Sequence, residues 1–172
     1  PASKATATFA LLAGDRRRAA AFCEEGWMLG QGEPQFLGNG VLLACWALAE
    51  RDPERLDWCV KMGNELAVSR KLSLLDALSL RAGLIDAALD LEDLDTADAQ
   101  GRLASKHFGR EDMPPLAIFL ERRAAALVDS ADLVLDTNVA TSLHELTEQA
   151  ERMGWRVWLP ALDAALALTS EV

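Results

Sequence analysis

Small and apolar side chains recur along this chain at the spacing of an α-helix. After Asp52-Pro53 they follow one another three and four positions apart, at Leu56, Cys59, Val60, Gly63, Leu66 and Ala67. Residues 35–50 are apolar on nearly all sides, which predicts a helix packed between neighbours. The pattern predicts nine helices and assigns no strand: 3–13, 15–29, 35–50, 53–67, 71 or 73 to 89, 95 or 96 to 108, 114–127, 137 or 138 to 153, and 160–169.

Capping residues set the predicted helix ends. Asp52 has the side chain of an N-cap, and Pro53 suits the first helical position, where a missing N–H costs nothing. Gly109 and Gly154 suit helix C-termini, because glycine adopts the left-handed conformation freely. Three helix starts keep two candidate residues each: Lys71 or Ser73, Asp95 or Thr96, and Thr137 or Asn138.

Four acidic turns each join two of the predicted helices into a pair. Their aspartates, Asp15, Asp52, Asp93 and Asp132, lie 37, 41 and 39 residues apart. A period near forty with two helices per unit is typical of helical-repeat proteins. We therefore predict an all-α solenoid of about four antiparallel helical hairpins, formed by residues 1–172 as one domain. Arrays of this kind usually present extended binding surfaces.

Composition and charge limit the classes of partner that the chain is expected to bind. The chain has 172 residues, of which 51% are apolar, so it can bury a core and is too apolar for a disordered chain. Its formal net charge is −10, and its best basic run, Arg16-Arg17-Arg18, sits among acids. Nucleic acid requires clustered cations, so we expect none as a direct ligand. The longest apolar run, residues 41–49, is far too short for a membrane span, and we expect no membrane partner.

Three cysteines, Cys23, Cys45 and Cys59, lie in apolar helical patterns without a close pair. We expect them to be buried thiols of a cytoplasmic protein, because the reducing cytosol keeps such residues free. No signal peptide is visible. Because the chain begins with Pro1 rather than Met, we also expect it to be a piece of a longer protein.

The residues that follow these turns resemble the tetratricopeptide family, which places small side chains where two helix backbones cross. Gly14-Asp15 is followed at the family's steps by Ala19, Cys23 and Gly26, and Asp93 by Ala97, Gly101 and Ala104. The period exceeds the family's usual spacing of about 34 residues, and its aromatic positions and closing proline are mostly missing. Longer units of this sort resemble the helical sensor arms of large bacterial transcriptional regulators, notably at residues 148–154 and 159–163.

The resemblance implies a non-catalytic protein-interaction or signal-sensing domain, tetratricopeptide-like, without a cofactor or a bound metal. Some members of the family grip a terminal carboxylate with cations on the concave helices. The matching positions here include Asp86 and Asp90, and none of them is basic. We therefore expect a protein or peptide partner of apolar or basic character, and assembly with further copies of the chain stays open.

Five tryptophans are further candidates for binding. Trp46 and Trp58 lie inside apolar helices, where we expect core positions; in one alternative, a small-molecule sensor, they line a pocket. Trp27, Trp155 and Trp158 lie near predicted helix ends, where they would pack on a neighbouring repeat or anchor a partner.

A second alternative is enzymatic. The segment Leu133-Val-Leu-Asp136-Thr137-Asn138 resembles the opening strand of PIN-type nucleases, in which the aspartate helps to hold Mg²⁺ for phosphodiester cleavage. Residues 157–160 resemble that fold's second strand. Only 36 residues follow Asp136, although the family needs further acids over a longer span. The competing interpretation is a loop in which Asp136, Thr137 and Asn138 cap the next helix. The two histidines, His107 and His144, have no further ligand at metal spacing.

Overall fold

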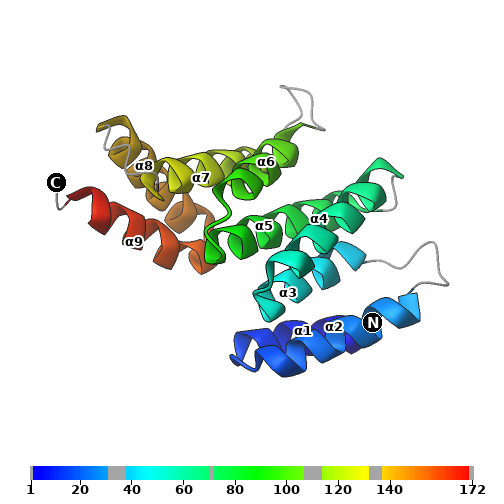
Figure 1. The fold of residues 1–172 in the computed structure, drawn as a ribbon. Helices are drawn as coiled ribbons and strands as arrows, with labels where there is room; N and C mark the ends of the chain where they lie inside the picture. The colour runs from blue at the N-terminus through cyan, green and yellow to red at the C-terminus, as the bar shows by residue number, and fades with distance from the viewer. Residues whose placement is uncertain (1, 31–37, 70–71, 107–113, 132–136, 171–172) are drawn as a thin grey trace. The chain divides into compact units, whose positions relative to one another are not determined.

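The computed structural model describes residues 2–30, 38–69, 72–106, 114–131 and 137–170, and nearly all of them are helical (Figure 1). Nine α-helices and one short 3₁₀-helix lie in these ranges: α1 (Ala2–Leu12), α2 (Arg16–Gly30), α3 (Asn39–Glu50), α4 (Pro53–Val68), α5 (Leu74–Asp90), α6 (Leu94–Ser105), α7 (Pro115–Ala131), α8 (Thr137–Met153), η1 (Arg156–Trp158) and α9 (Leu159–Ser170). No strand occurs in these ranges, so the all-α prediction is confirmed for them.

Two of the predicted helix starts are confirmed in detail. The N–H of Arg55 donates to the Asp52 carboxylate at 2.8 Å, and Pro53 is the first residue of α4. The N–H of Asp76 donates to the Ser73 hydroxyl at 3.2 Å, so Ser73 rather than Lys71 caps α5. Residues 31–37 lie outside the described ranges, and α3 begins at Asn39, later than the predicted 35.

The predicted cap of α6 is wrong by two or three residues. Helix α6 begins at Leu94, and Asp93 is its cap, because the N–H of Thr96 donates to the Asp93 carboxylate at 3.0 Å. The aspartate predicted as a member of the turn therefore also starts the next helix, and Asp95 and Thr96 lie in the first turn.

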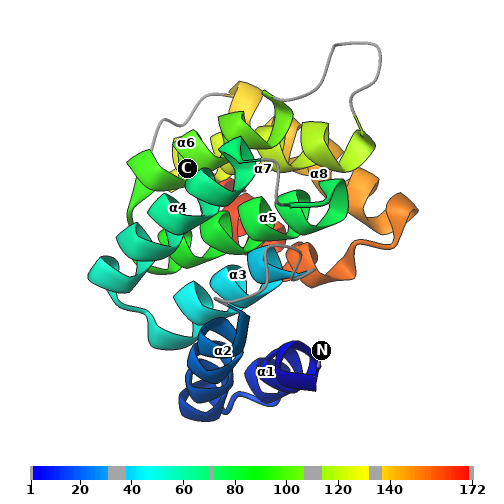
Figure 2. The same cartoon turned by 90° about the vertical axis from the view of Figure 1, so that its right-hand side faces the viewer.

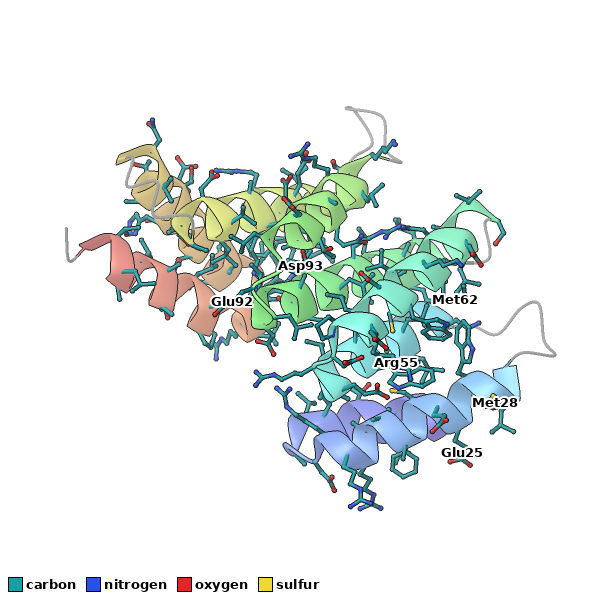
Figure 3. All side chains as sticks on the ribbon, viewed as in Figure 1. Glu25, Met28, Arg55, Met62, Glu92 and Asp93 are labelled. Atoms are coloured by element: carbon teal, nitrogen blue, oxygen red, sulfur yellow. The ribbon has the colours of Figure 1, made fainter. Side chains whose placement is uncertain are left out.

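The acidic turns share one backbone design. The residue before each aspartate is left-handed: φ is 78° at Gly14, 50° at Arg51 and 59° at Glu92. Each following aspartate, at positions 15, 52 and 93, accepts an N–H from the residue three positions later. One helix thus ends and the next is capped within two residues. Figure 3 labels Glu92 and Asp93 in one of these turns. The fourth aspartate, Asp132, lies outside the described residues.

The end of α8 follows the prediction, but its start is only partly described. Gly154 has a φ of 74° directly after α8, and the N–H of Trp155 donates to the Ala150 carbonyl at 2.8 Å. This pattern closes the helix as the glycine predicted. Thr137 and Asn138 stand in the first turn of α8, and Asp136 lies outside the described residues, as does Gly109.

The chain divides into two compact units, 1–97 and 98–172, with the boundary inside α6. In the first unit α3 is central and packs against α1, α2, α4 and α5 (Figures 1 and 2). Leu42 and Leu43 of α3 are fully buried. Helices α3 and α5 approach closely, since a Cβ at Gly83 would lie only 2.4 Å from the Cβ of Ala44. Glycine is therefore required where these two backbones cross.

The second unit is built around α7, α8 and α9, which contact one another. Its core includes the fully buried side chains of Phe119, Leu143 and Leu146. The part of α6 in this unit reaches α7 closely, because a Cβ at Gly101 would lie 2.5 Å from the Cβ of Ala124. Residues 157–160 form the end of η1 and the start of α9, so the strand expected there by the nuclease alternative is wrong.

Candidate functional site

A surface hollow of about 300 Å³ lies between α2 and α4 in the first unit; we call it the α2–α4 groove. Trp27 of α2 lines it together with Met62, Glu65, Leu66 and Ser69 at the end of α4. Figure 3 labels Met62 on α4 and Met28 near the end of α2. Three large apolar side chains and one carboxylate thus surround an opening on the surface.

One wall of the groove is anchored by a chain of aromatic rings. Trp27 meets Trp58 edge to face at a centroid distance of 5.3 Å, and Trp58 meets Trp46 in the same way at 5.2 Å. Such T-shaped pairs add to the energy of simple burial. The indole that borders the groove is therefore held by a second ring from α4 and, through it, by a third from α3.

Arg55 closes this aromatic cluster from one side (Figure 3). Its guanidinium lies 4.3 Å from the ring centroid of Trp46 and 5.2 Å from that of Trp58. The Arg55 Nε donates to the Glu50 carboxylate at 2.9 Å, and the Trp46 indole N–H donates to the same carboxylate at 2.6 Å. The positive charge of Arg55 is thus matched by Glu50.

Exposed apolar residues stand next to the lining residues in sequence, and one lining residue is acidic. Met28 is 65% exposed and Val68 is 81% exposed, next to the lining residues Trp27 and Ser69 in sequence. Glu65 is the one charged side chain among the described residues that line the groove. Within the described part of the chain it forms no ion pair, either with Lys61 one turn earlier or with another cation.

The three cysteines are buried near the aromatic cluster and are free thiols. Burial raises the pKa of Cys59 to about 12 and also raises the pKa of Cys45. Burial, followed by the neighbouring thiols, raises the pKa of Cys23. A thiol with a raised pKa is a poor nucleophile, because the thiolate is the reactive form. In the described ranges no three His, Cys, Asp or Glu side chains stand where they could share a metal ion.

The predicted candidates in the first unit are engaged within the protein. Trp46 is only 5% exposed and belongs to the aromatic cluster. Asp90 accepts from Arg51 at 2.7 Å and lies 3.7 Å from Arg16, so it joins α5 to the α3–α4 turn and to α2. Asp86 is half-buried and also has a partner. None of the three is placed in the α2–α4 groove.

The two tryptophans predicted near the chain's end pack within the second unit. The ring centroid of Phe119 lies 4.8 Å from that of Trp155 and 5.4 Å from that of Trp158. The guanidinium of Arg123 lies 5.7 Å from the Trp158 ring. Trp155 and Trp158 are half-buried and cover Phe119, which gives them a place in this unit's core.

A second hollow, of about 310 Å³, lies between α7 and α8. Asn138 lines it together with Arg122, Asp129 and Ser142, among others. Arg122 is paired with Glu145 at 2.6 Å. The structure thus gives Asn138 a surface position beside a cation and a carboxylate, whereas Asp136 of the same motif lies outside the described residues.

Sequence reasoning did not find the α2–α4 groove. Trp27 was a candidate and Leu66 belonged to a helical stripe, but Met62 was not singled out. The spacing of four residues between Met62 and Leu66, one helical turn, was the one available signal. Among the described residues, no helix combines the length and the apolar character that crossing a membrane requires. No family model, no curated protein and no solved structure matches the chain.

Proposed function

We propose that this chain is a tetratricopeptide-like helical-repeat module that binds a protein or peptide. The packing order of the first unit supports the repeat. In a stack of hairpins, each first helix meets the next first helix, and each second helix packs on the hairpin that follows. Here α1 contacts α3, α3 contacts α5, and α2 packs against α3. The left-handed residue followed by a capping aspartate, found at three hairpin turns, is a further common element.

The observation that carries the binding proposal is the α2–α4 groove. Trp27, Met62 and Leu66 leave apolar surface open around a hollow large enough for a side chain. Burying one large apolar side chain stabilises a complex by about 1.5–3 kcal/mol. Tryptophan is enriched among the residues that dominate binding energy, and methionine adapts its shape to different partners. A rigid indole beside a flexible thioether suits a protein ligand.

The role of the whole protein follows from the resemblance to regulator arms. We propose that the module reports the presence of its partner to other parts of a bacterial transcriptional regulator, and has no catalytic step of its own. Binding between α2 and α4 would bridge two successive hairpins. A change in their packing is then the signal that such an arm passes on.

The experiment is a selection of displayed random peptides on the immobilised chain. We expect enriched peptides whose binding falls at least tenfold in Met62→Ser, because this substitution removes the apolar wall of the groove. Met153→Ser is the matched control, since Met153 is exposed in the second unit. Circular dichroism and thermal melting check that both variants fold.

Two results would refute the proposal. The first is a selection that enriches nothing above the immobilised support. The second is a set of peptides that bind wild type and Met62→Ser equally, because their site would then lie elsewhere.

A further inference from the structure

We infer that the occupant of the α2–α4 groove is a basic amphipathic helix, which inserts one bulky apolar side chain and places a Lys or Arg beside Glu65. The inference rests on the proposed function and names the chemistry of its partner.

The anchor follows from the lining of the hollow. Trp27, Met62 and Leu66 present apolar surface around about 300 Å³. Trp27 is held by Trp58, so the indole offers a fixed face, whereas Met62 can adjust to the side chain that enters. A leucine, isoleucine or phenylalanine of the partner would bury its side chain there, as in other helix-in-groove complexes.

The charge follows from the carboxylates at the edge. Glu65 lines the groove from α4, and Glu24 lies one helical turn before Trp27 on the same flank of α2. Both are exposed, and neither forms an ion pair within the described ranges. The chain as a whole carries a net charge of −10. A partner with cations beside its apolar anchor gains complementary charge on both sides, whereas an acidic partner is repelled.

The helical form follows from the position between two helices. The groove has α2 on one side and α4 on the other; the exposed Met28 follows Trp27 in sequence, and the exposed Val68 lies between Leu66 and Ser69. A helix laid between them presents residues of one face, three and four positions apart, to successive apolar surfaces. Its opposite face stays in water, so the segment needs to be amphipathic.

The test uses two labelled model peptides of about 18 residues with the same helical pattern of leucines. One carries lysines on its polar face and the other carries glutamates. Fluorescence anisotropy measures their affinity for the full chain. We expect the lysine peptide to bind at least tenfold more tightly than the glutamate peptide. Because any basic peptide is attracted to an acidic protein, this result alone does not locate the site.

Charge reversal at two positions shows whether the lysine peptide binds in the α2–α4 groove. Glu65→Lys should weaken binding of the lysine peptide about tenfold, because it places a cation inside the groove. Glu25→Lys is the matched control: Glu25 is also an exposed glutamate, and it projects away from α4 (Figure 3). It makes the same change in net charge and should alter binding less than twofold. Met62→Ser should weaken binding as Glu65→Lys does.

The outcomes separate this inference from the proposed function. Equal weakening by Glu65→Lys and Glu25→Lys means that the peptide follows net charge, which overturns the inference. A glutamate peptide that binds as tightly as the lysine peptide also overturns it. If peptides selected by display lose binding in Met62→Ser but are neutral or acidic, the groove is a binding site and only its predicted partner is wrong.

Discussion

Asp76 offers the sharpest test of how this fold is held together. This residue of α5 is 6% exposed, and its carboxylate accepts three backbone N–H groups at the start of α3. The donors are Gly38 at 3.1 Å, Gly40 at 3.3 Å and Val41 at 3.2 Å. No side chain of the α3 N-terminus itself supplies a cap. A carboxylate from another helix thus takes the place of a local capping residue.

The cost of Asp76→Ala can be worked out from the surroundings of each donor. The bond from Gly40 is buried, so an unsatisfied N–H there costs about 1–3 kcal/mol. The bonds from Gly38 and Val41 are only partly buried, and water can replace the acceptor, at about 0.5 kcal/mol each. Loss of a negative charge at a helix N-terminus adds about 0.3–1 kcal/mol. We expect a loss of about 3 kcal/mol in the free energy of unfolding.

Urea unfolding followed by far-UV circular dichroism measures this loss. Asp76→Asn keeps one acceptor oxygen without the charge and should lose about half as much. Asp57→Ala is the control, because Asp57 is exposed and makes no contact of this kind in the described ranges; it should stay within about 0.5 kcal/mol of wild type. A loss below 1 kcal/mol for Asp76→Ala, or one equal to that of Asp57→Ala, would refute the reasoning.

Three further predictions concern packing, titration and backbone strain. Gly83→Ala should destabilise the protein by about 2 kcal/mol in urea unfolding, because its Cβ meets Ala44 at 2.4 Å, whereas Ser79→Ala on the same helix should be neutral. The pKa of Cys59 is raised from 9.0 to about 12, so the free energy of unfolding should fall as pH rises from 9 towards 12, by up to ~1.4 kcal/mol per pH unit. Under reductant, Cys59→Ala should make this pH dependence less steep. An unchanged slope would contradict the assignment. Glu92→Gly should raise the free energy of unfolding by about 0.5–1 kcal/mol, because glycine adopts a φ of 59° without strain; a lower melting temperature would contradict it.

The elements that the sequence predicted well depend on neighbours in the chain. The capping residues act on backbone groups within about four positions, as at Asp52 with Pro53, Ser73 and Gly154. Their effect can therefore be predicted without knowing the tertiary structure. Asp93 was missed as a cap because Asp95 and Thr96, just after it, have side chains of the same kind. The choice among such candidates depends on where the preceding helix stops, which the left-handed Glu92 sets.

The candidate site was predicted less well, because the tertiary structure decides which side chains stay available for a partner. Trp46 and Asp90 had suitable chemistry, but Trp46 is buried in an aromatic cluster and Asp90 is held in ion pairs at the surface. Asp76 stands in the first turn of α5, where acidic residues are common, so its place in the sequence does not single it out. Its three donors stand 35 to 38 residues away in the chain, and no local pattern marks such a contact.

The sequence by itself determined the helices of this protein and the acidic turns between them. Helical periodicity and capping act between residues at most a few positions apart, so they can be predicted from the order of side chains alone. The tertiary structure decided which apolar side chains remain open. Trp27 and Met62 face one hollow because two helices of the first unit pack beside α3, and that packing is a property of the whole unit rather than of any segment.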